Sequence, residues 1–194
     1  MKARLILFIS YFLLLSCVTR LPTPQGIKEI STSDYESLVE SKTQKTEVYD
    51  GFYNKLTVQA TKIDADMSES ITAYSAKLSQ WNLDKYNEEK SKLIMTHSTT
   101  TEFFMSFYTP ERKHDDLSQK KTSWKIYLEV NGQRYEGKAT KVKSLYLDLE
   151  ALYPHHNRWS TPYLVSFPVS TPSTEGKKMT LTVTGPLATS QLQF

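Results

Sequence analysis

The chain contains little cysteine and little glycine, and each shortage excludes a class of protein. Its single cysteine, Cys17, permits no disulfide within the 194 residues, which excludes a small disulfide-stapled scaffold. Its six glycines form no glycine-rich loop of the kind that cradles phosphate groups. The chain also lacks a sustained lysine and arginine run, so nucleic-acid binding has no electrostatic footprint in the sequence.

Long apolar runs and catalytic motifs are equally scarce. The one apolar run, Leu5 to Leu15, is well below the roughly 20 residues that a membrane-spanning helix needs. Neither a Gly-x-Ser-x-Gly elbow nor a His-Glu-x-x-His motif occurs. Carboxylate pairs such as Asp64 and Asp66 are too ordinary to indicate acid–base catalysis. We therefore expect a protein that is not an enzyme, with a hydrolase of dispersed site as an alternative.

The first residues carry the strongest motif of the chain. Lys2 and Arg4 precede the apolar run, which closes on Leu14-Leu15-Ser16-Cys17. A basic start, a short apolar stretch and a small residue before the cut are the marks of a secretory signal. Together with the cysteine they resemble the signal peptide and lipobox of bacterial lipoproteins.

That resemblance implies a location and an anchor. A signal peptide of residues 1–16 would be removed, and Cys17 would carry the acyl chains that hold the protein to a membrane. Val18 follows the cysteine instead of the aspartate that retains many such lipoproteins in the inner membrane, so the resemblance favours the outer membrane. The inner membrane, or secretion after an ordinary cleavage, is the alternative.

The remaining chain is long enough for one domain. Starting at Cys17 it has 194 − 16 = 178 residues, with 24 − 2 = 22 basic against 21 acidic side chains. This near-neutral balance again argues against a nucleic-acid partner, and no residue pattern indicates a cofactor. We expect an acylated cysteine and tether at 17–31, a strand and helix region at 32–98, and an antiparallel β-sandwich at 99–194.

Within 32–98 the patterns change twice. A short helix is expected from Ser33 to about Ser41, and residues 46–63 alternate as two strands around a turn at Asp50-Gly51, with a helix as the alternative. Residues 64–95 predict a helix with Asp64 as its N-cap and with a kink or a restart at residues 81–84, where Asp84 would cap the second part. One face of it carries apolar side chains at helical spacing, namely Met67, Ile71, Tyr74, Leu78 and Trp81.

From Thr99 the sequence predicts short strands separated by turns. Asn131-Gly132 lies between two alternating runs and predicts a type I′ hairpin. Further strands are expected at Leu145–Leu149, Tyr163–Val169, Met179–Thr184 and Ser190–Phe194. The fold class is therefore α+β, with an N-terminal helical segment packed on a C-terminal antiparallel β-sandwich of immunoglobulin-like form.

One loop stands out as a candidate binding site. Residues 153–159 combine aromatic, imidazole and guanidinium side chains between two expected strands, and the candidate residues are Tyr153, His155, His156, Arg158 and Trp159. Aromatic and planar polar groups suit stacking on a sugar or a protein hot spot. The alternative of a transition-metal site would combine His155 and His156 with His114 and the neighbouring Asp115 and Asp116, but surface histidines in polar loops explain the pattern better, so no metal is expected.

The expected function follows from anchor and fold. We expect a lipid-anchored envelope protein that presents a β-sandwich surface to a protein partner. Recognition of a glycan or a cell-wall fragment through the Tyr153–Trp159 loop is the alternative.

Overall fold

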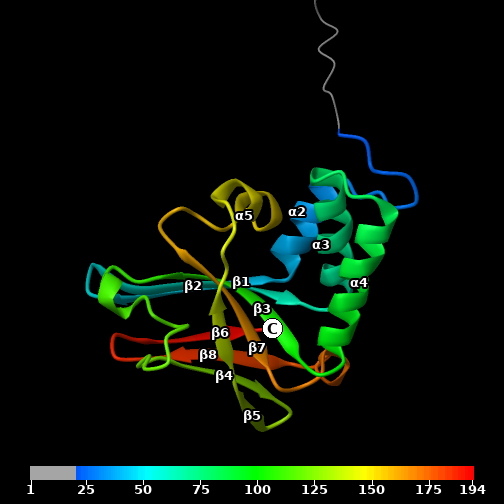
Figure 1. Ribbon diagram of the computed structural model, residues 1–194. Coiled ribbons are helices and arrows are strands. Elements are labelled where there is room, and N and C mark those ends of the chain that lie inside the picture. Colours follow the sequence, from blue (N-terminus) through cyan, green and yellow to red (C-terminus); the bar gives the residue numbers. More distant parts are fainter. Residues whose placement is uncertain (1–20) are drawn as a thin grey trace, which may run out of the picture.

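The structure, a computed structural model, describes residues 21–194. The expected signal peptide, the lipobox and Cys17 therefore lie outside the described residues. Two antiparallel sheets share one apolar core, and helices gather at one end of them (Figure 1). The expectation of an α+β protein with helices packed on a sandwich of sheets is confirmed at this level.

Nine strands of the described chain form the two sheets. The five-stranded sheet has the order β1-β2-β3-β7-β6, and the four-stranded sheet has the order β5-β4-β8-β9. Their bounds are β1 (Thr43–Asp50), β2 (Tyr53–Ile63), β3 (Thr101–Tyr108), β4 (Lys125–Val130), β5 (Gln133–Glu136), β6 (Lys138–Lys141), β7 (Thr161–Phe167), β8 (Met179–Thr184) and β9 (Thr189–Gln193). The core between the sheets is built from fully buried side chains of both, such as Leu56, Phe103, Leu128 and Leu181.

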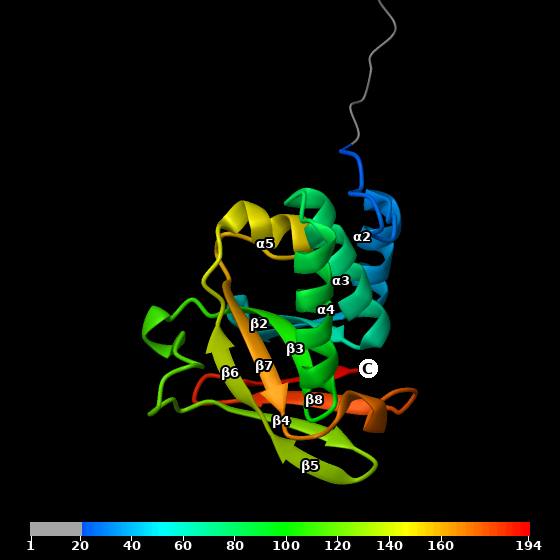
Figure 2. The ribbon, with the colours of Figure 1, turned by 45° about the vertical axis from the view of Figure 1, so that its right-hand side comes forward.

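The helices cover part of the outer face of the five-stranded sheet. They are α2 (Thr32–Ser41), α3 (Ala65–Leu78), α4 (Leu83–His97) and α5 (Tyr146–Leu152), with short 3-10 turns η2 (Arg112–His114) and η3 (Thr171–Ser173). Figure 2 shows α2, α3 and α4 side by side, with α5 beside them above the sheet. Leu149 and Tyr153 pack with Ile63 and Phe104, so α5 seals this part of the face.

The strands expected in residues 46–63 are confirmed. β1 and β2 pair antiparallel, and Gly51 takes a positive φ of 59° in the turn between them. Leu56, Val58 and Ala60 are fully buried, as their period-two spacing predicts. Because β2 also pairs with β3, the region 32–98 supplies two strands to the same sheet as residues 99–194.

The helical stretch from residue 64 is two helices. Asp64 caps α3, since its Oδ1 accepts the Met67 amide at 3.1 Å. The prediction of a cap at Asp84 is wrong: Asn82 caps α4 and accepts the Lys85 amide at 2.9 Å. The chain restarts here because an asparagine at Ncap satisfies a free helix amide, while Asp84 already lies within the first turn.

One predicted strand is wrong. Leu145–Leu149 does not form a strand, because residues Tyr146–Leu152 form α5. Leu145 and Leu147 are each 73% exposed, whereas Leu149 is buried against the sheet. A short apolar run fits a strand and a helix equally well, and here burial of one helical face against Phe104 decides.

The hairpin expected at Asn131-Gly132 is confirmed. Both residues have positive φ, at 52° and 76°, as a type I′ turn requires. The strand then leaves its sheet at Gly137, whose amide donates to the Ile126 carbonyl at 2.8 Å, and continues as β6 in the other sheet. A Cβ on Gly137 would lie 2.5 Å from Cε1 of Phe167, so glycine alone fits this crossing.

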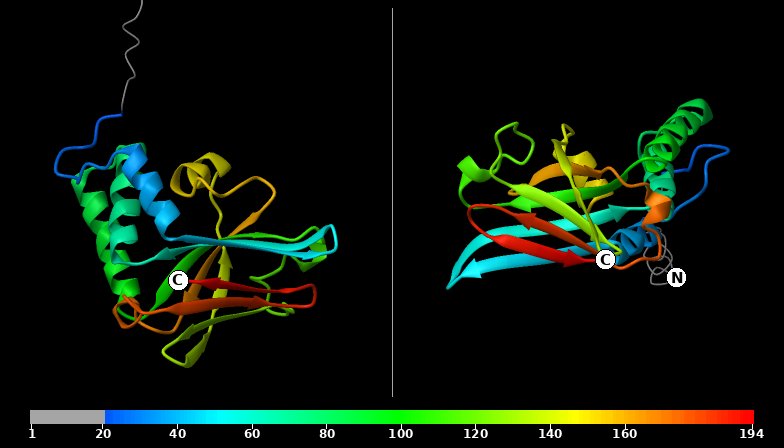
Figure 3. Two further views of the ribbon diagram at one scale, coloured as in Figure 1. Left: turned by 180° about the vertical axis from the view of Figure 1, so that it is seen from behind. Right: turned by 90° about the horizontal axis from the view of Figure 1, so that it is seen from below.

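The two sheets also come close to each other at their β1 and β9 edges. Thr46 Oγ1 in β1 donates to the Gln191 carbonyl in β9 at 3.0 Å, and Figure 3 shows these strands running close together. In the same figure the β1–β2 hairpin projects away from the helices. Residues 21–31, part of the segment expected as a tether, run along α3 and α4, with Ile27 buried against Ala73 and Tyr86.

Candidate functional site

The outer face of the five-stranded sheet is covered at one end only. The register of β2 and β3 places Gln59 opposite Ser106 and Thr57 opposite Tyr108. Phe104, on the same face of β3, is buried below α5. Toward Thr57 and Tyr108 the face is left to the loop that joins α5 to β7, the segment in which the sequence predicts a binding site.

The start of this loop anchors it to the sheet. Tyr153 is 7% exposed, and its ring stacks on Phe104 with centroids 3.6 Å apart and planes 4° apart. Burial raises the pKa of the Tyr153 phenol above its usual range, and the charge of Glu102 adds to the effect. Tyr153 is therefore a packing residue, not a contact for a ligand.

The two adjacent histidines also face the protein. His156 is buried, and its Nδ1 lies 2.9 Å from Ser106 Oγ. His155 Nε2 lies 3.4 Å from Thr61 Oγ1, and burial, followed by the neighbouring His156, lowers the pKa of His155 to about 4. Both imidazoles are neutral at neutral pH. Within residues 21–194 no three histidine, cysteine or acidic side chains come close enough to bind a metal ion.

The end of the loop is presented to solvent. Trp159 is 65% exposed. Asn157 Oδ1 accepts the amides of Trp159 at 2.9 Å and of Ser160 at 3.2 Å, so an Asx turn fixes the backbone that carries the indole. Arg158 is exposed next to it. Of the five candidates, the structure brings Arg158 and Trp159 to the surface and uses Tyr153 and His156 for packing.

Trp159 borders a hollow of about 430 Å³ on the sheet, which we call the loop groove. Its lining residues come from β1, β2, the end of β3 and the loop: Lys45, Glu47, Thr57, Gln59, Tyr108, Asn157, Trp159 and Ser160. A second hollow of about 500 Å³ adjoins it, because Gln59 lines both, and it reaches His155 and Glu40.

Some of the side chains that line the loop groove form ion pairs or hydrogen bonds with each other, and others have no such partner. Lys45 Nζ and Glu47 Oε1 form an ion pair at 2.5 Å, which lowers the pKa of the Glu47 carboxyl. Among the described residues the Gln59 side chain makes no hydrogen bond, so its amide is free to donate and to accept. A flat aromatic surface beside free amide and hydroxyl groups suits a ligand with an apolar face and many hydroxyls.

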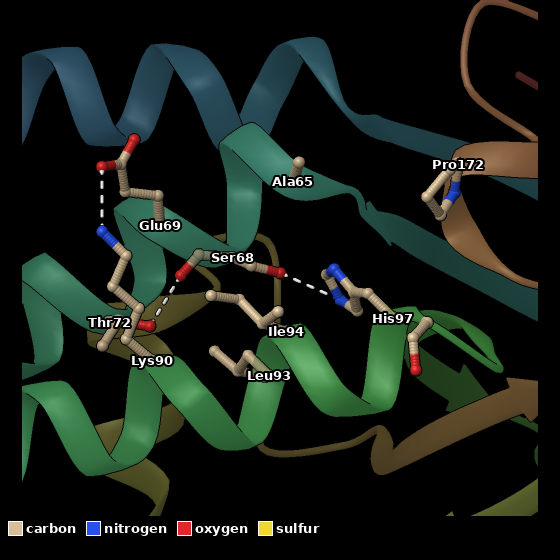
Figure 4. Close-up of a pocket in the computed structure, with 10 residues that line it drawn as sticks. Ala65, Ser68, Glu69, Thr72, Lys90, Leu93, Ile94, His97 and Pro172 are labelled. Atoms are coloured by element: carbon tan, nitrogen blue, oxygen red, sulfur yellow. Dashed lines mark hydrogen bonds and ion pairs between the residues drawn. The ribbon is translucent and has the colours of Figure 1, made fainter.

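A further hollow of about 330 Å³ lies between α3 and α4, and we call it the interhelical pocket (Figure 4). Its walls include Leu93, Ile94 and Pro172, and Lys90 pairs with Glu69 at 3.7 Å beside it. At its inner end Ser68 Oγ lies 3.1 Å from His97 Nε2. Burial lowers the pKa of His97, and Asp64 and Glu175 oppose this effect.

A serine hydroxyl bonded to an imidazole is one element of a nucleophilic site. Such a site also needs a group that orients the other imidazole nitrogen and donors for an oxyanion. In the described part of the chain His97 Nδ1 has no hydrogen-bond partner, and the Ser68 amide is used by the Asp64 carbonyl. The pair satisfies two buried polar groups, and the interhelical pocket does not assemble the rest of an acyl-transfer site.

Sequence reasoning identified the loop but missed its partners in the groove. Lys45, Gln59 and Tyr108 come from three different strands, and only the register of β1, β2 and β3 brings them beside Trp159. The signal available was the exposed side of the β2 alternation, where Thr57 and Gln59 are polar. The Ser68–His97 pair, from two helices, left no signal in the sequence.

Comparison with known proteins adds no relative. Among residues 21–194, every helix is too short or too polar to cross a bilayer. No protein-family model, no curated protein and no solved structure matches the chain.

Proposed function

We propose that this protein is a non-catalytic binding protein of the cell envelope and that the loop groove binds a glycan or a cell-wall fragment. The observation that carries the proposal is Trp159, 65% exposed yet held on an Asx turn at the edge of a polar hollow. The turn fixes the backbone that carries the indole, a side chain with only two rotatable bonds to order on binding, and the indole face can stack on the apolar face of a sugar ring. The free amide of Gln59 adds hydrogen bonds to hydroxyls.

Anchoring at the membrane is part of the same proposal. The support is the sequence at the start of the chain, where Leu14-Leu15-Ser16-Cys17 resembles a lipobox and Val18 favours the outer membrane. A cell-wall ligand and a lipid anchor are compatible, because both belong to the same compartment. Acyl chains on one cysteine would hold the domain next to the wall.

We further propose that the sandwich is immunoglobulin-like. Its support is strand order: without β1, the sheets read β2-β3-β7-β6 and β5-β4-β8-β9, which corresponds to A-B-E-D and C′-C-F-G. The buried Trp124, directly before β4, packs edge-to-face on Phe107 of β3 at 5.2 Å. A tryptophan at strand C facing strand B is a feature of that fold, and the inter-sheet disulfide is impossible here.

A protein partner is the second candidate, and a different surface supports it. The tip of the β1–β2 hairpin exposes Phe52 fully and Tyr53 by 77%, on the side of the molecule away from the helices (Figure 3). Exposed aromatic side chains of this kind are enriched in the centres of protein interfaces. The hairpin tip is thus the part of the sandwich surface that we propose for a protein.

The groove proposal is tested by titrating the full chain with a panel of soluble cell-wall fragments and oligosaccharides in a calorimeter. Trp159→Ala is expected to weaken binding of the preferred fragment about tenfold or more, because the stacking surface is lost. Tyr53→Ser, at the hairpin tip, is the matched control and should bind as the unmodified chain does. Equal affinity of Trp159→Ala and the unmodified chain, or no binding by any fragment, would overturn the proposal.

The anchor is tested by intact mass. Protein extracted from membranes should have lost residues 1–16 and gained the mass of acyl chains, and Cys17→Ser should show neither change. An unmodified cysteine in the mature protein would show that the chain is secreted without a lipid.

A further inference from the structure

The end of β2 places a lysine where the strand pattern requires an apolar side chain. Leu56, Val58 and Ala60 face the core between the sheets, and each is fully buried. Lys62 continues this series and is only 8% exposed. A buried ammonium is costly unless an opposite charge lies beside it.

The described residues give Lys62 no such partner. Asp64, two residues further along the chain, is already engaged: its Oδ2 pairs with Lys42 Nζ at 2.5 Å and its Oδ1 caps α3 at Met67. No hydrogen bond or ion pair within residues 21–194 involves the Lys62 side chain. The residue is thus buried for most of its length, while its ammonium group has no partner among residues 21–194 and is not among the buried unpaired atoms.

Lys62 lines a cavity of about 440 Å³, which we call the lysine cavity. It lies where the end of α2, the end of β2 and the loop before β8 meet, and its lining residues are Ser41, Lys42, Gln44, Lys62, Asp64, Gly176, Lys177, Lys178, Met179, Gln193 and Phe194. Lys177 and Lys178 are exposed and form no ion pair among the described residues. Asp64 is the one acidic residue in this lining, and three of the lining lysines, Lys62, Lys177 and Lys178, form no ion pair among residues 21–194.

The electrostatics agree with a missing anion. Burial lowers the pKa of the Lys62 ammonium and the neighbouring Lys42 lowers it further, while Asp64 and Glu175 act in the opposite sense. A bound anion would offset both the lost hydration and the repulsion between the lysines. The lining also contains a neutral donor. Gln193 Oε1 accepts from Thr180 Oγ1 at 3.0 Å, which leaves the NH₂ group of Gln193 to donate to a ligand.

We propose that the lysine cavity binds a phosphate-type oxyanion through Lys62, Lys177 and Lys178. Three separate ammonium groups can contact different oxygens of one tetrahedral anion, and a cavity of this size admits a phosphate with a small substituent. The anion is a free phosphate or phosphate monoester, or the phosphate of a lipid headgroup. The lysine cavity shares no lining residue with the loop groove, so the inference does not depend on the glycan proposal.

The test is thermal unfolding of the full chain with Cys17→Ser, which removes any lipid anchor, in inorganic phosphate against chloride of equal ionic strength. Phosphate at about ten times its Kd should raise the midpoint by about 3 °C or more. Lys62→Met should abolish that shift, because it removes the ammonium group that contacts the anion and keeps an apolar side chain of similar length. Lys177→Ala with Lys178→Ala, at exposed positions, should weaken the phosphate response without altering the fold.

Lys120→Met is the control, because it removes one positive charge from an exposed loop and should keep the whole phosphate response.

A second experiment measures sedimentation of the protein with phosphatidylcholine vesicles that do or do not contain an equal part of phosphatidylglycerol. If the protein binds vesicles and Lys62→Met does not, the anion is a lipid phosphate. If phosphate raises the midpoint but the protein does not bind vesicles, the anion is a free phosphate or phosphate monoester. A phosphate shift that persists in Lys62→Met, or no Lys62-dependent response in either arm, overturns the proposal, whereas Trp159→Ala should leave every result unchanged.

Discussion

Gly137 joins the two sheets at a point where no side chain fits. It lies between β5 and β6, and its amide bonds to the Ile126 carbonyl while the Phe167 ring occupies the space of a Cβ. The ring belongs to the shared core and stacks edge-on against Phe103 at 5.8 Å. A larger residue at 137 must therefore displace a core aromatic.

Gly137→Ala is expected to destabilise the protein by about 1–3 kcal/mol, the usual cost of forcing extra volume into a packed core. Urea unfolding measures this free energy. Lys138→Ala, at the next and exposed position, is the control and should change stability by less than about 0.5 kcal/mol. Equal stabilities for the two variants would show that Phe167 yields without cost.

Three histidines couple stability to pH. Burial lowers the pKa of His97, His155 and His156 below the ordinary 6.5. Below about pH 6.5 these histidines therefore bind protons more readily in the unfolded chain than in the folded protein, so their contribution to stability falls as pH falls. For His155, with a pKa of about 4, this loss develops between pH 6.5 and pH 4 and amounts to about 3 kcal/mol at most.

His155→Asn should therefore lose less stability between pH 7 and pH 4.5 than the unmodified protein. Urea unfolding at both pH values measures the difference. Burial raises the pKa of Glu102, so the contribution of this residue to the stability of the folded protein grows as pH falls. Glu102 is present in both proteins, so its contribution cancels when their stabilities are compared. The same loss in both proteins would mean that His155 is protonated in the folded state near its ordinary pKa.

At the scale of elements, one hydrogen bond ties α2 to α5. The fully buried Tyr35 donates from its hydroxyl to the Leu152 carbonyl at 2.9 Å, and its ring stacks on Tyr74 of α3 with centroids 4.1 Å apart. Burial raises the pKa of the Tyr35 phenol. Because α5 leads into the Tyr153–Trp159 loop, this contact fixes the point at which that loop begins.

Tyr35→Phe is expected to cost about 1–2 kcal/mol, since it leaves the part-buried Leu152 carbonyl at the end of α5 without its donor. Tyr49→Phe provides the control: its hydroxyl donates to Glu47 at 3.2 Å, but the side chain is 53% exposed. That change should cost less than about 0.5 kcal/mol in the same denaturation measurement. A Tyr35→Phe protein as stable as Tyr49→Phe would contradict a structural role for the α2–α5 bond.

The elements were predictable where a local signal specified the backbone. Asn131-Gly132 requires two positive φ angles, and the alternation of Leu56, Val58 and Ala60 fits one buried face, so both appear in the sequence itself. The segment at Leu145–Leu149 has no such signal, because its leucines fit a strand as well as a helix. Contact with Phe104, distant in sequence, selects the helix.

At the scale of the whole molecule, the candidate site is a product of register. Trp159 was recognisable from its loop, but Gln59 and Tyr108 join it only because β2 and β3 pair with Thr57 opposite Tyr108. The same reasoning explains why Tyr153 and His156 leave the candidate set: the face that they would offer to a ligand is the one that packs on β3. The pairing of strands that are far apart in the sequence cannot be predicted from the residues of either strand alone.

The architecture also separates the proposed functions in space. The loop groove lies on the outer face of the five-stranded sheet, the exposed aromatic tip ends the β1–β2 hairpin, and the lysine cavity lies at the helix end of β2. Substitutions at Trp159, Tyr53 and Lys62 should therefore act independently, each altering one kind of binding. A single substitution that altered two of them would show that the surfaces are coupled.

The most direct test of the account is NMR mapping of the full chain with the cell-wall fragment that binds best. The account predicts that the Trp159 indole NH and the side-chain amides of Gln59 and Asn157 shift together on titration, while the Trp124 indole NH, which donates to the His114 carbonyl, stays in place. Shifts confined to the hairpin tip around Phe52 and Tyr53, or no shift of the Trp159 indole at saturation, would contradict it.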